Sequence, residues 1–253
     1  FNGQGVRNKL RNTLVIFDAK TGEQKQVSQQ FTNVAGAAVS PDKKHILFTG
    51  TTYENMSTRE GALFLYDIES GETKTIIEQD KYAIGSPFFM DNGKAFFTIN
   101  DMEFNGKNGY FCTLDVATGA WAKMDVWADA EVGGAVGTDC NMGGGMNKKM
   151  KDGKLYMTRA VWGDSHLCVM DMESGVDATI CDKQGSINSF DLAGNKAFAV
   201  CNRGQELNEI YAIDLESGEE TCMTAFNKQY AAEHENVAPE HFTFKNKDSV
   251  ELD

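Results

Sequence analysis

Ser165 followed by His166 is the pair in this 253-residue chain that most resembles a catalytic group. Hydrolysis by a serine needs a serine, a histidine and an acid that meet in space, and one widespread version places the serine in a G-x-S-x-G turn. No G-x-S-x-G occurs in the sequence, and two neighbouring residues on a predicted loop do not make a triad. We therefore predict that this chain contains no catalytic residue.

Metal and cofactor chemistry needs ligands at set spacings, and the sequence lacks these spacings. The four histidines, at positions 45, 166, 234 and 241, form no H-E-x-x-H motif. The six cysteines, at positions 112, 140, 168, 181, 201 and 222, form no C-x-x-C pair. We predict no metal, no cofactor and structural roles for the histidines. Cysteines within apolar runs favour reduced thiols in a cytoplasmic protein, with disulfides as the alternative.

Two further patterns resemble ion sites. The glycine-rich stretch GTDCNMGGGMNKKM, residues 137–150, lacks the G-x-x-x-x-G-K-[ST] motif of a phosphate loop, and no helical pattern follows it. Close backbone packing in a strand or an irregular loop explains these glycines better, and no base accompanies Cys140 as a nucleophile. The aspartates of the repeat described below lack the D-x-[DN]-x-[DN]-G pattern of a calcium loop, so we predict turns there.

The charge balance narrows the class of partner. The chain has 37 acidic and 24 basic residues, which gives a formal charge of −13. Nucleic acid binding rewards clustered lysine and arginine, so an acidic chain argues against it. No apolar run approaches the ~20 residues of a membrane-spanning helix. The excess of acid is typical of a soluble, self-repelling surface.

A short sequence motif recurs five times, and the structural elements that it forms must position the residues of any functional site. Variants of LFLYDIESGET, which begins at Leu63, each pair an aspartate with a glycine four residues later. An aspartate side chain accepts backbone N–H groups at the start of a turn, and glycine takes the positive-φ position that closes a hairpin. The five pairs are Asp18 with Gly22, Asp67 with Gly71, Asp115 with Gly119, Asp171 with Gly175, and Asp214 with Gly218.

Each repeat contains four predicted strands, which is the pattern of a β-propeller blade. The predicted fold is all-β: a partial β-propeller of four-stranded antiparallel blades, about four and a half in this chain. We predict a half-blade at residues 13–28, full blades at about 31–79, 81–128, 130–182 and 184–227, and a linker at 229–253, so that the propeller fills residues 1–228. Trp121 and Trp127 are expected to pack between blades. Open blade edges allow a homo-oligomer.

Four stretches resemble one family. SPDKKHILFTG, from Ser40, is similar to its S-P-D-G-K-x-I-x-F turn, with a lysine where glycine is usual. CNRGQELNEIYAIDLESGEETCMTAFN, from Cys201, resembles its last blade, and PEHFTFKNKDSVELD, from Pro239, resembles the segment that leads into its hydrolase domain. FNGQG at residues 1–5 resembles an internal propeller loop. Over nearly its whole length, and least over 130–150, the chain resembles propellers of prolyl oligopeptidase-family serine peptidases, in the acylaminoacyl-peptidase-like branch.

This resemblance implies a chain cut at both ends, with earlier blades before Phe1 and an α/β-hydrolase domain of the same parent chain after Asp253. It implies a non-catalytic propeller that gates the active site, admits short peptides and positions them. The alternative is a free-standing propeller that acts as a binding scaffold for proteins or ligands. A propeller glycosidase ranks last, because it needs inward-facing carboxylates and the repeated aspartates fall at hairpin turns.

Residues that face a substrate are expected on the loops between the second and third strands of the blades. Such loops lie on one face of a propeller, and in this chain several are long and polar. The alternative is that their side chains are ordinary solvated loop residues. The candidates are Tyr53, Glu54, Arg59, Arg159, Trp162 and Arg203.

Overall fold

Strands dominate the chain and pair with their neighbours in sequence. The computed structural model describes residues 10–90, 92–103, 109–124, 133–134, 136, 145–204, 206–234, 237 and 240–252. The chain divides into two compact units, Phe1–Asp129 and Ala130–Asp253.

The first unit contains one two-stranded and two four-stranded antiparallel sheets. Their orders are β1-β2, β3-β4-β5-β6 and β10-β9-β8-β7, so each sheet is an up-and-down meander. The sheets fall within the ranges 13–28, 31–79 and 81–128 expected for the half-blade and the first two blades. The strands are β1 Val15–Phe17, β2 Gln24–Gln26, β3 Thr32–Val39, β4 His45–Thr52, β5 Ala62–Asp67, β6 Thr73–Ile77, β7 Tyr82–Phe89, β8 Lys94–Asp101, β9 Tyr110–Asp115 and β10 Trp121–Lys123.

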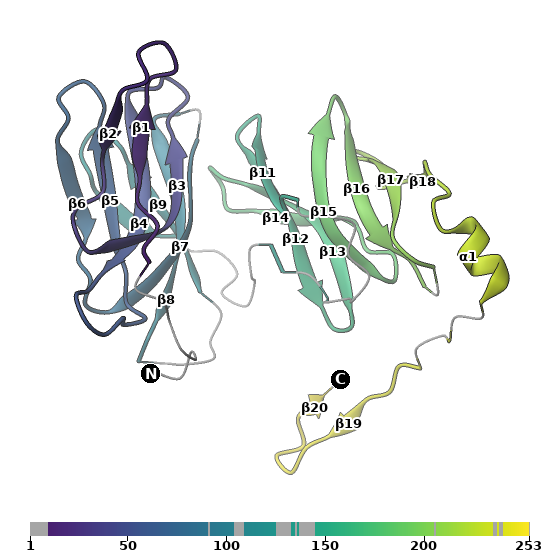
Figure 1. Ribbon diagram of the computed structural model, residues 1–253. Helices are drawn as coiled ribbons and strands as arrows, with labels where there is room; N and C mark the ends of the chain where they lie inside the picture. Colours follow the sequence, from purple (N-terminus) through teal and green to yellow (C-terminus); the bar gives the residue numbers. More distant parts are fainter. Residues whose placement is uncertain are drawn as a thin grey trace. The chain divides into compact units, whose positions relative to one another are not determined.

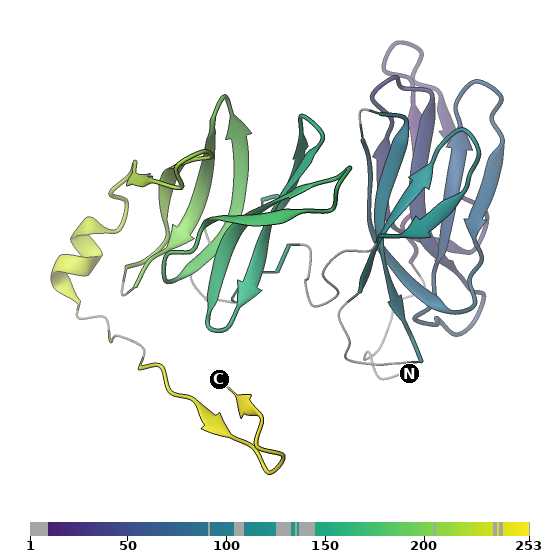
Figure 2. The same ribbon diagram turned by 180° about the vertical axis from the view of Figure 1, so that it is seen from behind.

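The second unit contains two more four-stranded sheets, β11-β12-β13-β14 and β15-β16-β17-β18, which lie side by side in Figures 1 and 2. They fall within the ranges 130–182 and 184–227. A short helix and a two-stranded hairpin follow. The elements are β11 Lys148–Lys151, β12 Lys154–Val161, β13 Asp164–Asp171, β14 Asp177–Cys181, β15 Ser186–Ala193, β16 Lys196–Asn202, β17 Glu209–Asp214, β18 Glu220–Cys222, α1 Lys228–Glu233, β19 Phe244–Lys245 and β20 Glu251–Leu252. The predicted fold class, a partial β-propeller, is confirmed.

Blade strands are apolar on both faces, which explains why the sheets stack. Successive side chains of a strand point to opposite faces. In β4, Ile46 and Phe48 join a buried cluster with Val27, which follows the half-blade strand β2. Leu47, between them in sequence, joins a different cluster with Phe97 of β8. One strand therefore contributes to two cores, one on each side of its sheet.

Aromatic contacts fill these cores. The rings of Phe48 and Phe64 stack with centroids 4.9 Å apart. Trp121 meets Phe97 edge-on at 5.9 Å and packs against the cluster that the first two full blades share, as expected for a residue between blades. Trp127 lies outside the described residues.

The five turns between third and fourth blade strands share one geometry. In each, Oδ1 of the aspartate accepts a hydrogen bond from the backbone N–H three residues on, over 2.7 to 3.0 Å. The glycine has a φ of 72° to 77°, and its N–H donates to the aspartate carbonyl. Backbone hydrogen bonds lower the pKa of all five carboxyls, those of Asp18, Asp67, Asp115, Asp171 and Asp214. In the SPDKK turn, Lys43 takes a positive φ of 60°.

The described residues give three further findings. The cysteines at 112, 168, 181, 201 and 222 are free thiols, whereas Cys140 lies outside the described residues. No helix in the described part of the chain is long and apolar enough to cross a membrane. At the half-blade, β1 exposes Val15 and Phe17, and the homo-oligomer through open edges stays a prediction.

Two glycines with the same φ allow the energetic effect of backbone conformation to be distinguished from that of packing. Gly218 and Gly153 both have a φ of 73°, but a Cβ on Gly218 would overlap the carbonyl oxygen of Ile180, whereas a Cβ on Gly153 would meet nothing within 4 Å. We expect Gly153→Ala to lower the free energy of unfolding by about 1 kcal/mol, from the left-handed conformation alone. Gly218→Ala should cost roughly 3 kcal/mol or more, because backbone must move. Urea unfolding followed by circular dichroism measures both, and equal losses would show that the turn does not contact the neighbouring sheet.

Candidate functional site

The connections between second and third blade strands differ in length. The first runs from Tyr53 to Gly61, between β4 and β5. The connection between β12 and β13 contains only Trp162 and Gly163, because Val161 pairs with Asp164. These connections carry five of the six candidate residues, whereas Arg159 lies within β12.

Tyr53 and Glu54 begin a loop that a distant arginine holds. Arg11 Nη2 donates to the carbonyl oxygens of Tyr53, at 2.6 Å, and Glu54, at 3.2 Å. Its guanidinium also lies over the Tyr53 ring, 4.4 Å from the centroid. Arg59, further along the loop, is exposed. The loop base is thus held by main-chain contacts, while the side chains of Glu54 and Arg59 face solvent.

Arg159 does not lie on a loop, so this part of the sequence interpretation is wrong. It is within β12, opposite His166, and is 5% exposed. Its Nη1 contacts Oδ2 of Asp177 at 2.5 Å. Because the turn that follows has only two residues, the strand extends further than a longer loop would allow. The geometry is that of an ion pair within one blade.

Ser165 and His166 are also strand residues rather than loop residues. Ser165 is fully buried, and its hydroxyl donates to the carbonyl of Ile187 at 3.2 Å. A buried hydroxyl bound to a backbone carbonyl has neither access to substrate nor a base. Burial raises the pKa of the Cys201 thiol to about 12, so that cysteine is also a poor nucleophile.

Arg203 anchors the last of these connections. Its Nη2 lies 2.9 Å from Oε2 of Glu220, its Nε contacts both carboxylate oxygens, and its Nη1 donates to the carbonyl of Lys183. The side chains of Arg203 and Glu220 are only 10% and 6% exposed. Lys183 Nζ adds a third charge, 3.6 Å from Glu220. Arg203 therefore ties a loop to β18.

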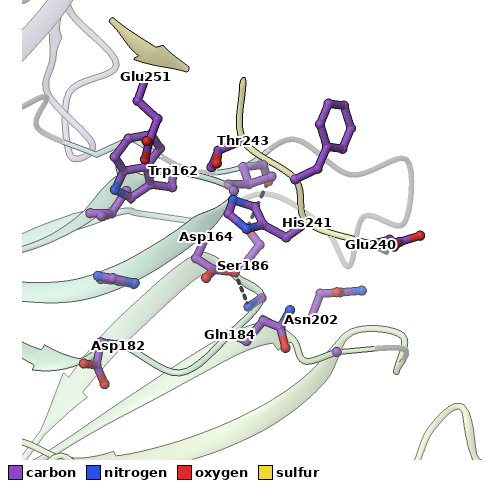
Figure 3. A pocket seen from close by; sticks show the side chains of 17 residues that line it. Trp162, Asp164, Asp182, Gln184, Ser186, Asn202, Glu240, His241, Thr243 and Glu251 are labelled. Carbon is purple, nitrogen blue, oxygen red and sulfur yellow. Dashed lines mark hydrogen bonds between the residues drawn. The ribbon is translucent and has the colours of Figure 1, made fainter. Parts of the chain in front are cut away.

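Trp162 is a candidate whose side chain is largely exposed to solvent. It is 65% exposed and has a positive φ of 55°, a conformation that large side chains rarely adopt. The same turn borders a pocket of about 950 Å³ in the second unit (Figure 3). Of the six candidates, only Trp162 lines this pocket.

The pocket combines segments that are far apart in sequence. Its walls come from the Trp162 turn, the connection into β15, the end of β16 and the C-terminal segment, and Figure 3 shows Trp162 and Glu251 on one side and Gln184 and Asn202 on the other. Sequence reasoning missed these residues because no local motif links them. The labelled polar lining residues are Asp164, Asp182, Gln184, Ser186, Asn202, Glu240, His241, Thr243 and Glu251.

Several sequence hypotheses fall on residues that are not described. These are the phosphate-loop alternative for residues 137–144, a nucleophilic Cys140 and the FNGQG stretch at residues 1–5. Within the described residues, no group of three histidine, cysteine, aspartate or glutamate side chains is placed to hold a metal ion.

Glu209 anchors the chain where it leaves the last blade. Its carboxylate accepts hydrogen bonds from the backbone N–H groups of Phe226, at 3.0 Å, and Asn227, at 2.8 Å, and from the Thr224 hydroxyl. Burial opposes ionisation of this 6%-exposed residue, but these hydrogen bonds outweigh burial and hold the pKa of Glu209 below its ordinary value. The segment before α1 is therefore fixed to β17.

Comparison with known proteins supports the fold and assigns no family. No family model and no curated protein matches this sequence. An acylaminoacyl peptidase of Pyrococcus horikoshii aligns over 95% of this chain and 34% of its own, with 19% identity and a TM-score of 0.67. A puromycin hydrolase aligns over 90% of this chain and 34% of its own, with 17% identity and a TM-score of 0.64. The β-propeller domain of the Trilobed protease from Pyrococcus furiosus aligns over 85% of this chain and 62% of its own, with 18% identity and a TM-score of 0.57.

These likenesses define the class of the protein as a propeller. The resemblance to peptidase propellers predicted from the sequence is confirmed at the level of fold, since several solved structures agree. The chain spans about a third of the length of the acylaminoacyl peptidase and of the puromycin hydrolase. A shared fold does not assign an activity.

Variants of two arginines, Arg203 and Arg59, test the difference between a structural and a surface role. Arg203→Ala leaves the buried Glu220 without its main partner, so we expect a loss of roughly 3–5 kcal/mol in local stability. Arg59→Ala, in the exposed loop between β4 and β5, should cost clearly less, because water solvates exposed charged groups that lose a partner. Hydrogen exchange of amides in β16–β18 and in β4–β5 measures each effect. A loss at Arg203 as small as that at Arg59 would mean that the ion pair does not hold this loop.

The Glu209 anchor predicts a pH dependence. A carboxyl whose pKa is lower in the folded protein stabilises it above the unfolded pKa, and that contribution disappears as pH falls through the folded pKa. We therefore expect Glu209→Gln to lower stability at pH 7, by about 2 kcal/mol for lost charged hydrogen bonds. The difference from the unsubstituted protein should shrink below pH 4.5. Urea midpoints between pH 3 and pH 7 measure it, and a difference independent of pH would contradict an ionised anchor.

Proposed function

We propose that this chain is the propeller domain of a serine peptidase, in which it acts beside an α/β-hydrolase domain of the same parent protein. The propeller would admit and position short peptides, and residues of the hydrolase domain would cleave them. The observation that carries this proposal is the alignment of 95% of the chain with only a third of an acylaminoacyl peptidase. A second support is the stretch from Pro239, which resembles the segment that leads into a hydrolase domain.

The distribution of chemistry in the chain agrees with a positioning role. Ser165 is buried and bound to a backbone carbonyl, so it is not available as a nucleophile. The pocket that Trp162 borders contains carboxylates, histidines and amides that can bind a ligand. We include Tyr53, Glu54, Arg59 and Trp162 among the substrate-facing residues of the proposal, and we assign Arg159 and Arg203 positioning roles in their blades. A reducing, cytoplasmic setting for the free thiols belongs to the same proposal.

The reading frame beyond Asp253 tests this function directly. We expect a G-x-S-x-G motif within about 200–250 residues, because an α/β-hydrolase domain carries its nucleophile in that turn. The full-length protein should hydrolyse short peptide or aminoacyl substrates, and replacing the serine of that motif with alanine should abolish the activity. Residues 1–253 alone should show no turnover. A stop codon directly after Asp253 would support a free-standing binding scaffold, and turnover by the isolated chain that a serine-reactive inhibitor abolishes would contradict a non-catalytic domain.

A further inference from the structure

The pocket beside Trp162 is biased toward positively charged ligands. Four carboxylates line it, those of Asp164, Asp182, Glu240 and Glu251, and none of the described residues that line it is a lysine or an arginine. We propose that this pocket binds an ammonium group carried by a short peptide. Its role in choosing substrates rests on the proposed function, whereas the binding itself does not require a hydrolase domain.

In the described part of the chain, no ion pair holds the carboxylates that line the pocket; Lys245 is the cross-strand neighbour of Glu251 in the terminal hairpin, but no ion pair joins the two side chains. Within the described part of the chain, the side chains of Asp182, Glu240 and Glu251 make no hydrogen bond or ion pair. Asp164 accepts one hydrogen bond, from the N–H of Gly185 at 2.8 Å, which orients its carboxylate and leaves other acceptor sites open. Like charges that share a cavity repel one another, so a cationic ligand gains from meeting them.

The basic residues closest in sequence to the pocket are already paired. Lys183 stands between the lining residues Asp182 and Gln184, but its ammonium lies 3.6 Å from Glu220. Arg203 stands between two more lining residues, and its guanidinium also binds Glu220. The Glu220 carboxylate thus holds both cations in contacts away from the pocket lining, which leaves the pocket negative.

Trp162 supplies an aromatic face, which also attracts cations. The face of an indole ring attracts ammonium and guanidinium groups, and tryptophan does so most strongly among aromatic residues. In Figure 3, the Glu251 carboxylate lies on the same side of the pocket as the Trp162 ring. Both residues line the pocket, so a π face and carboxylates are available there to an ammonium group.

The size and composition of the pocket favour an organic cation over a metal ion. No three carboxylate, histidine or cysteine side chains of the described residues are close enough to hold a metal. A volume of about 950 Å³ is at the upper end of the range for small-ligand pockets and suits two or three peptide residues. Val161 and Phe242 supply apolar wall for neighbouring side chains of such a peptide.

Three related peptides, which differ in whether and where they carry an ammonium group, test the proposal by isothermal titration calorimetry on the whole chain. Ala-Leu-Phe-amide carries an α-ammonium, acetyl-Lys-Leu-Phe-amide carries a side-chain ammonium, and acetyl-Ala-Leu-Phe-amide carries neither. We expect at least one of the two charged peptides to bind about tenfold more tightly than the neutral one, and the better of the two identifies the source of the ammonium. Raising the salt concentration should weaken that binding, because the attraction is screened.

A pair of variants separates this pocket from the general acidity of the chain. The double variant Asp182→Asn with Glu251→Gln should weaken binding of the charged peptide about tenfold. The control, Glu216→Gln with Glu219→Gln, removes two exposed charges in the same unit away from the pocket lining and should leave binding unchanged. Trp162→Leu should also weaken binding of the charged peptide and leave the neutral peptide unaffected.

Three results would contradict the proposed ammonium site. These are equal binding of charged and neutral peptides, no binding of either charged peptide, or equal losses in the pocket variant and the control variant. Failure of the peptidase proposal is seen separately, in the reading frame beyond Asp253, and is compatible with an intact ammonium site in a free-standing propeller.

Discussion

Burial of both faces of each blade is the constraint on which the rest of the structure depends. A sheet such as β3–β6 has Phe48 on one face and Leu47 on the other, and neither face can be left to water. In the first unit, the clusters that contain Val27 and Phe97 cover the two faces of this sheet. Because many strand side chains are buried in packing, the polar and charged residues that differ between blades lie in the connections or in the few ion pairs between strands.

Those few charged residues fix the positions of strands, connections and the exit from the last blade. Arg203 with Glu220, and Arg159 with Asp177, are ion pairs in which one or both side chains are nearly excluded from water, and such pairs are costly unless their geometry is good. Their benefit is positional: Arg159 joins the second strand of its blade to the fourth, and Arg203 joins the connection before β17 to the fourth strand of its blade. Glu209 acts similarly at the exit from the last blade, where it holds Asn227. In this way the acidic and basic residues of the last blade define where the connection before β17 and the segment before α1 can lie.

The sequence predicted the features that depend on residues close together in the chain and missed those that depend on residues far apart. The Asp67–Gly71 turn follows from residues four apart, and its five copies predicted the repeated antiparallel sheets. Arg159 was misplaced because the length of its turn depends on the Val161–Asp164 pairing, which residue types alone do not show. The pocket was missed because Glu251 and Trp162 are 89 residues apart and share no motif. Only Trp162 was recognised, as a large side chain at a polar turn.

The same residue type serves two purposes in this acidic chain, and the difference lies in its partners. Asp67 and its four counterparts are stabilised by backbone N–H groups, which lower their pKa values and make them part of the fold. Asp182 has no such donor among the described residues, and neither has Glu251. A carboxylate that the fold does not use for itself keeps its full attraction for an external cation. The acidic residues of the chain thus include carboxylates that build the turns of the blades and others in the pocket that are available to a ligand.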